Sequence, residues 1–165
     1  MKTKTTLDSP VGRLVLVAEG EALAGLYIST EHRHAPDLDL PVDDGALPAV
    51  REQLAAYFSC DLKEFDVPLA VAGTPFQQQV WAALRTIPYG ETWSYKELAE
   101  AIDRPSAVRA VGLANGRNPV SIVVPCHRVI GADGSLTGYG GGLAAKEWLL
   151  AHEAGSPAWS SDSLL

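Results

Sequence analysis

The first part of the chain alternates short apolar runs with polar breaks. Residues 13–18 and 22–28 are rich in branched apolar side chains, and the turn signal at 19–21 separates them, which predicts a β-hairpin. In residues 47–59 the apolar positions recur at helical spacing, so this stretch is predicted to form an α-helix. Residues 64–67 are expected to add a third strand, which ends before a proline.

After a Gly-Thr-Pro boundary, the apolar positions change to a helical period. Thr74 is a suitable N-cap for a helix over 75–87, which has proline at its first position. A serine opens a second helix over 94–102, because a glutamate three residues later completes a capping box. After a tight turn, Ser106 is expected to cap a third helix, over 106–114.

The second and third of these helices form the helix-turn-helix pattern, in which the later helix contacts DNA. Two strand-like runs at 122–124 and 128–130 and a final helix over 144–153 follow, as in a winged-helix variant. We therefore predict an α+β protein of two domains. A small N-terminal α/β domain with an antiparallel sheet covers 1–74, and a C-terminal winged helix-turn-helix domain covers 75–165.

Composition places the chain among globular proteins, because 165 residues that are 47% hydrophobic and 20% charged can bury a core. The formal net charge of −7 argues weakly against a nucleic-acid partner, but the charge is uneven. Residues 1–74 hold six basic and twelve acidic residues, whereas 75–165 hold seven and eight. Within 104–146, five basic residues accompany a single acid, a local net charge of +4. This stretch is either an anion-binding face or a set of cations scattered over the surface.

The compartment is inferred from what the sequence lacks. No stretch approaches the roughly 20 apolar residues that span a bilayer, and no secretory signal is visible at the N-terminus. The two cysteines, Cys60 and Cys126, are therefore expected to be reduced thiols rather than a disulfide. We predict a cytoplasmic protein, associated with the nucleoid if the source is bacterial.

The two cysteines differ in their sequence surroundings. Cys60 ends a predicted helix and has no visible chemistry. Cys126 follows an apolar run and Pro125, and it precedes a histidine and an arginine. A neighbouring base or cation favours the reactive thiolate, so Cys126 is a candidate nucleophile. On these residues alone, a buried structural cysteine remains the alternative.

The stretch around Cys126 resembles the active-site signature of the O6-alkylguanine-DNA alkyltransferases, also called methylated-DNA–protein-cysteine methyltransferases. The signature is Pro125-Cys126-His127-Arg128-Val129, with Asn118-Pro119 at short range before it. The similar segments cover most of residues 75–153: Phe76–Trp81, Ile87–Thr92, Ser94-Tyr95, Arg109–Gly112, Gly138-Tyr139 and Lys146–Leu150. Residues 1–74, which would be the family's ribonuclease-like domain, match more loosely.

The resemblance implies a suicide DNA repair protein. Such a protein flips an O6-alkylated guanine, chiefly O6-methylguanine, out of duplex DNA and transfers the alkyl group irreversibly to Cys126. The family's relay draws the thiol proton through water toward His127 and Glu153. Glu147 is the competing carboxylate, which we interpret as a surface residue. Glu153 could also merely cap its helix, although an anion near a helix C-terminus argues mildly for a specific partner.

The same resemblance assigns the remaining residues of the chemistry. Tyr95 is the hydroxyl donor to the base ring, although a half-buried helix aromatic is the plainer interpretation. Asn118 is the hinge residue, which bonds across the turn before the active-site strand. The substrate pocket is expected to be lined by Val129, Tyr139, Gly140 and Gly141, where glycine lets the backbone approach the base closely.

For DNA, the resemblance makes Arg109 the arginine finger that fills the space left by the flipped nucleotide. Small residues around it would allow a close approach to the minor groove, although small residues also serve helix packing. The expected DNA contacts are Arg109, Ala107, Ala110, Gly112, Arg117 and Arg128.

No cofactor is expected, because the sequence has no S-adenosylmethionine fingerprint and the damaged DNA itself donates the alkyl group. No metal is expected, because a zinc site in the N-terminal domain would need Cys60, His32 and His34 plus further ligands. The expected partner is double-stranded DNA that contains O6-alkylguanine, and no membrane. O4-alkylthymine as a second substrate, and cooperative assembly of the monomer on DNA, stay open. The alternative functions are a cysteine hydrolase and a non-catalytic winged-helix protein that binds alkylated DNA.

Overall fold

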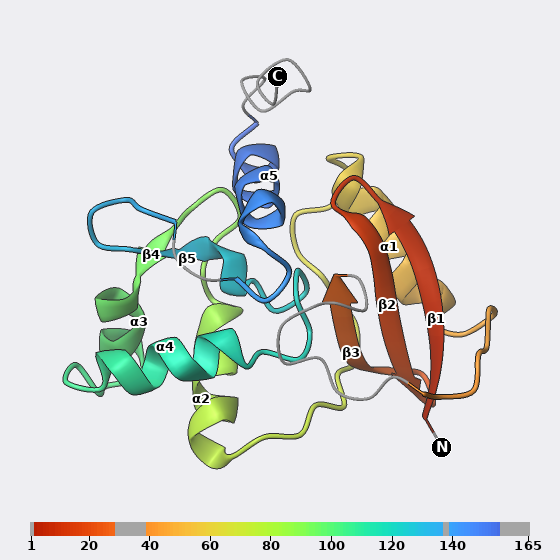
Figure 1. Ribbon diagram of the computed structural model, residues 1–165, viewed down its shortest axis with the longest axis horizontal. Coiled ribbons are helices and arrows are strands. Elements are labelled where there is room, and N and C mark those ends of the chain that lie inside the picture. Colours follow the sequence, from red (N-terminus) through yellow and green to blue (C-terminus); the bar gives the residue numbers. More distant parts are fainter. Residues whose placement is uncertain (1, 29–38, 137–138, 156–165) are drawn as a thin grey trace.

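The computed structural model describes residues 2–28, 39–136 and 139–155. Its elements follow the order β1 (Lys2–Ser9), β2 (Gly12–Glu19), β3 (Ala22–Ile28), α1 (Pro48–Phe58), α2 (Pro75–Leu84), β4 (Trp93–Ser94), α3 (Tyr95–Ala101), α4 (Val108–Gly116), the 3-10 helix η1 (Cys126–Arg128), β5 (Val129–Ile130) and α5 (Leu143–Glu153). The sheet and α1 form one side of the molecule and α2, α3 and α4 the other, with α5 between them (Figure 1). The predicted class, α+β with a sheet unit followed by a helical unit, is confirmed.

The N-terminal sheet has the strand order β1-β2-β3 and is antiparallel throughout. The predicted hairpin is therefore confirmed as β2 and β3. Strand β1 was not predicted, because only Thr5 of its residues is buried and its polar side chains hide the pattern. The predicted strand at 64–67 is wrong: the chain contacts the sheet slightly later, where Leu23 pairs with Leu69 in an isolated bridge.

The helix-turn-helix begins as predicted and then departs in one detail. Capping boxes open α2 at Thr74 and α3 at Ser94, so both predicted N-caps are confirmed. The predicted cap at Ser106 is wrong, because α4 has Ala107 at its N-cap and no side-chain cap. The backbone replaces that cap, since the Ala107 N–H donates to the Arg104 carbonyl at 2.9 Å within the turn between α3 and α4.

The wing is shorter than predicted. Residues 122–124 form no strand; they belong to a buried turn in which Ile122 has a left-handed φ of 74°. Of the predicted strand at 128–130, only β5 pairs, and it runs parallel to the two-residue strand β4. The Cys126 thiol therefore emerges from a 3-10 helix, whose hydrogen bonds hold three consecutive residues in one turn.

One continuous hydrophobic core joins the two units, from Leu14 in β2 to Leu149 in α5. The backbone joins them too, because the edge strand β3 binds the segment that leads to η1. The Leu26 N–H donates to the Pro119 carbonyl at 2.9 Å, and the Ser121 N–H donates to the Leu26 carbonyl at 3.2 Å. Within the described ranges, no helix is long and apolar enough to cross a membrane.

Candidate active site around Cys126

The segment that leads to Cys126 is closed by a side chain as well as by β3. Asn118, which is buried, donates from Nδ2 to the Val124 carbonyl at 2.7 Å and accepts at Oδ1 from the Val120 N–H at 3.0 Å. These bonds tie the start of the loop to its end and so fix the point at which η1 begins. The structure places Asn118 at the turn that the hinge interpretation requires.

A buried network centred on Glu153 lies beside the nucleophile. Oε2 of Glu153 accepts from His127 Nε2 at 2.8 Å and from the Tyr57 hydroxyl at 2.6 Å. Arg128 donates from Nε to Oε1 at 2.7 Å and from Nη2 to Oε2 at 3.0 Å. The Glu153 side chain is only 1% exposed, and four charge-assisted hydrogen bonds hold its carboxylate in this buried position. Glu147, the competing carboxylate, is half-buried earlier on α5, and the bond to His127 comes from Glu153.

These contacts determine the protonation states of Glu153 and His127. Burial alone would raise the pKa of Glu153, but His127 and Arg128 outweigh it and hold that pKa well below its usual range. An ionised carboxylate only accepts hydrogen bonds, so Nε2 of His127 carries a proton. Burial, opposed by Glu153, lowers the pKa of His127, and the ring is therefore neutral near pH 7 with Nδ1 unprotonated. Among the described residues, nothing donates a hydrogen bond to Nδ1.

The Cys126 thiol is protonated at rest. The residue is 5% exposed, and burial raises the pKa of its thiol, although neighbouring polar and cationic groups oppose this rise. Lys146 is the cation among them. It is fully buried, donates from Nζ to the Val129 carbonyl at 2.7 Å, and has a pKa that burial lowers to about 8. Its positive charge favours the thiolate over the thiol.

Two residues of this site, Lys146 and Tyr57, were not predicted. A signal for Lys146 exists in the sequence, because Lys146, Leu149 and Glu153 recur at the spacing of one helix face. Charged residues on an apolar face are expected to have polar partners. Lys146 binds the Val129 carbonyl and Glu153 binds Arg128. Tyr57 lies 96 positions from Glu153 and looks like an ordinary core aromatic of α1. No local pattern reveals its partner.

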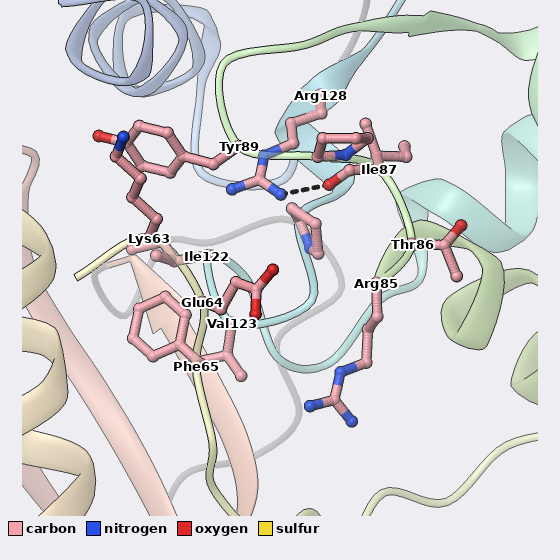
Figure 2. A pocket seen from close by; sticks show the side chains of 12 residues that line it. Lys63, Glu64, Phe65, Arg85, Thr86, Ile87, Tyr89, Ile122, Val123 and Arg128 are labelled. Atoms are coloured by element: carbon pink, nitrogen blue, oxygen red, sulfur yellow. Dashed lines mark hydrogen bonds between the residues drawn. The ribbon is translucent and has the colours of Figure 1, made fainter.

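Arg128 contradicts its prediction as a DNA contact. Its side chain is 8% exposed, and besides Glu153 it binds the Ile87 carbonyl through Nη1 at 2.6 Å (Figure 2). The Tyr89 ring lies beside it, with its centroid 5.7 Å from the guanidinium carbon. Arg128 is therefore a buried residue that binds and positions the Glu153 carboxylate. The cavity of about 280 Å³ next to it is lined by none of the predicted base-pocket residues.

The predicted DNA-contact residues on and beside α4 are more exposed to solvent than Cys126, His127 and Glu153 are. Arg109 and Ala110 are exposed, Ala107 and Gly112 are half-buried, and Arg117 is exposed at the C-cap. A Cβ on Gly112 would lie 3.6 Å from the Tyr95 ring, so Tyr95, at the start of α3, packs across onto α4. Val108 and Leu113, two exposed large apolar residues, share this helix.

The predicted base-pocket residues come from two segments. Val129 is buried in β5, and its carbonyl is bound by Lys146. Tyr139 is also buried; burial and then the charge of Cys126 raise its pKa well above the usual value, which places its ring near the nucleophile. Gly140 and Gly141 follow and are half-buried. A Cβ on Gly141 would lie 2.7 Å from a methyl carbon of Ile28, so only glycine fits against β3.

Gly138, His32 and His34, which sequence analysis singled out, lie outside the described residues. Within the described part of the chain, no three His, Cys, Asp or Glu side chains gather as ligands for a metal ion. The absence of a metal therefore stays a prediction.

A small sheet unit supports a helix-turn-helix unit, and the latter carries a buried cysteine beside a histidine–glutamate pair. These features define a protein that combines a DNA-binding type of fold with a candidate cysteine nucleophile. Two family models cover nearly all of the chain. Residues 2–71 match the ribonuclease-like domain and residues 75–155 match the DNA binding domain of 6-O-methylguanine DNA methyltransferase. The chain belongs to the 6-O-methylguanine DNA methyltransferase family, and the resemblance inferred from its sequence is confirmed.

Individual relatives agree. The chain is 54% identical over 145 residues to a methylated-DNA–protein-cysteine methyltransferase of Mycobacterium tuberculosis, covering 88% of each chain. It is 50% identical to one of Methanosarcina acetivorans, covering 87% of this chain and 92% of the relative. A crystal structure of Mycobacterium tuberculosis OGT in complex with DNA superposes with a TM-score of 0.88 at 52% identity, covering 94% and 96% of the two chains.

Proposed function

We propose that this protein repairs O6-alkylguanine in double-stranded DNA by transferring the alkyl group, in a single turnover, to Cys126. The enzyme class, methylated-DNA–protein-cysteine methyltransferase, follows from the family and from the relatives at about 54% identity. The observation that carries the assignment of the acceptor is the buried thiol of Cys126 beside the neutral His127 ring, whose Nε2 is anchored on Glu153. His127 is the next residue along the chain, and we assign it as the base that takes the thiol proton.

The reaction is a displacement at the alkyl carbon. His127 Nδ1 takes the Cys126 proton through water, the sulfur attacks the alkyl carbon, and the bond from that carbon to O6 breaks. The electrons of the broken bond go to the guanine, which takes a proton from the Tyr95 hydroxyl. The proton taken up by His127 passes to solvent and Tyr95 regains one from solvent, so both side chains return to their neutral forms. The product is a thioether, which no group in this site can cleave, so the protein acts once. Lys146 lowers the cost of the thiolate during the attack.

DNA would be bound by α4. Arg109 is exposed, and its neighbours on this helix are small or apolar, with Val108 and Leu113 facing outward. Small side chains suit a close approach to the narrow minor groove, where an inserted side chain compensates part of the stacking lost when a base is flipped. The related OGT, 52% identical, was crystallised with DNA. Arg117 would add a phosphate contact at the end of α4.

The flipped base would lie between β5 and the segment after residue 138. We assign its lining to Val129, Tyr139, Gly140 and Gly141, and the hinge function to Asn118. A Cβ on Gly141 would lie within 3.1 Å of both Ile28 and the Tyr139 ring, so glycine leaves this segment close to Tyr139 without a side chain in the way. O6-alkylguanine is the substrate this pocket is proposed to take.

One experiment separates this function from a hydrolase and from a non-catalytic binder. The protein is incubated with a duplex that contains O6-methylguanine, and its intact mass is measured over time. We expect one stoichiometric gain of a CH₂ unit, with no gain for a duplex of unmodified guanine or for Cys126→Ala. The matched variant Cys60→Ala should gain the same mass as the wild type. Turnover without a lasting mass change indicates a hydrolase, and tight binding without any gain indicates a binder.

A further inference from the structure

The second cysteine, Cys60, faces a histidine across the boundary between the two units. Cys60 lies just after α1 and is exposed. Its sulfur is 4.0 Å from Nδ1 of His152, which is on α5, 92 positions later. Thiol and imidazole thus meet through the tertiary fold rather than through sequence.

The hydrogen bonding of His152 fixes which nitrogen faces the thiol. Its Nε2 lies 2.8 Å from the Tyr57 carbonyl oxygen, which can only accept, so Nε2 carries the proton. In the neutral ring, Nδ1 is then the acceptor and points to Cys60. A nucleophile, a base and a third group that orients the base are the components of activated cysteine sites. Here the orienting group is a backbone carbonyl.

The imidazole is held in this position by aromatic packing. It stacks on Trp148 with ring centroids 4.6 Å apart and an interplanar angle of 17°. The Tyr57 ring lies 5.2 Å away on another side. Tyr89 also interacts with Cys60; burial raises the pKa of Tyr89, so this hydroxyl is neutral near pH 7 and does not oppose a thiolate. Lys63 Nζ lies 5.7 Å from the Tyr89 centroid and adds a positive charge near the site.

Cys60 also occupies a backbone conformation that favours glycine. Its φ is 65°, and its N–H bonds to the Tyr57 carbonyl at 3.1 Å, as at the end of a helix. Side chains other than glycine are disfavoured in this conformation. The same conformation directs Sγ out of the helix end and toward α5.

We propose that Cys60 and His152 form a second thiol site, at which low-molecular-mass disulfides reversibly thiolate Cys60. His152 Nδ1 accepts the Cys60 proton, and the sulfur attacks one sulfur of the disulfide. A new S–S bond forms between Cys60 and that sulfur, and the S–S bond of the disulfide breaks. The leaving thiolate takes the proton held by His152. Cys60 is thereby oxidised and the departing thiol is reduced, by the same two electrons. The buried Cys126 takes no part. This site is independent of the function assigned to Cys126.

The test is thiolation of the folded protein by oxidised glutathione near pH 7.4, followed by peptide mass spectrometry. We expect one adduct per chain, on Cys60, that dithiothreitol removes. The rate should exceed that of Cys60 in the urea-unfolded chain by at least about threefold, since a positioned base is present only in the fold. His152→Gln should reduce the rate to the unfolded value, whereas Glu147→Gln, a matched exchange on the same helix, should leave it unchanged.

Three results overturn the proposal: an adduct on Cys126 instead of Cys60, a folded rate no higher than the unfolded rate, or a rate unaffected by His152→Gln. Circular dichroism establishes that each variant is folded. If His152→Gln does not fold, the comparison of folded and unfolded wild-type protein decides the question without it.

Discussion

Tyr57→Phe removes a single oxygen atom from the network around Glu153. The Tyr57 hydroxyl, fully buried, donates to Oε2 at 2.6 Å. Hydrogen bonds to a charged group contribute about 1.5–3 kcal/mol. After the change, Oε2 still accepts from His127 and Arg128, so no buried acceptor is left without a partner. We therefore expect the lower value, a loss of about 1.5 kcal/mol in the free energy of unfolding.

In a chain of this length, that loss corresponds to a decrease in Tm of about 3–6 °C. Since the hydroxyl also fixes the carboxylate that orients His127, the single-turnover rate of methyl transfer should fall by about threefold. Urea unfolding and quenched intact-mass time courses on an O6-methylguanine duplex measure the two effects. The matched control is Tyr27→Phe, which removes a buried hydroxyl of β3 outside the network.

Tyr27→Phe should transfer the methyl group at the wild-type rate. A Tyr57→Phe protein that matches the wild type in both stability and rate would contradict the role assigned to this hydroxyl, as would an equal loss of transfer rate in the two variants. A loss of stability with an unchanged rate would make Tyr57 a purely structural residue and remove it from the positioning of His127.

Three further predictions concern DNA, the leaving group and pH. Arg109→Ala should slow repair of a duplex by about tenfold or more while sparing reaction with free O6-methylguanine base, and equal losses on both would exclude the finger role. Tyr95→Phe should slow methyl transfer by about tenfold and leave binding to undamaged DNA, measured by fluorescence anisotropy, near the wild-type value. Because the pKa values of His127 and Glu153 are lowered in the folded protein, both groups take up protons at a higher pH in the unfolded chain than in the folded one. Stability in urea should therefore be greatest above about pH 6.5 and decline in acid, first through His127 and then, below about pH 4.5, through Glu153; His127→Gln should flatten the first decline.

Elements whose signal is local could be predicted from the sequence. The capping boxes at Thr74 and Ser94 each need only four residues, and both are present in the structure. Strand β1 escaped prediction because most of its side chains are polar and only one residue is buried. The strand proposed at 64–67 failed because two apolar residues that alternate with charged ones do not by themselves create a strand pairing. Backbone hydrogen bonds there depend on a partner that sequence spacing does not supply.

The residues of the site also divide into those with a local sequence signal and those that depend on distant contacts. His127 and Glu153 were inferred from a family signature, and the structure joins them at 2.8 Å. Arg128 was expected to contact DNA as one of the basic residues of the stretch 104–146, yet it is buried against the Ile87 carbonyl and a carboxylate from another helix. Whether an arginine points outward or supports a neighbour depends on which acid the fold brings near it. That information lies in contacts between residues far apart in sequence, as it does for Tyr57.

The acidic N-terminal unit contacts the catalytic unit at three points close to the proposed active site. Leu26 of β3 binds the segment that leads to Cys126, Ile28 presses on Gly141 beside the base pocket, and Tyr57 of α1 donates to Glu153. Because residues 1–74 carry a net charge of −6, this unit is repelled by DNA phosphates, while the stretch 104–146 carries +4. The negative charge of the whole chain is thus compatible with a DNA partner. Most of it lies in the unit that packs behind the active site, whereas α4, the helix proposed to bind DNA, lies in the other unit.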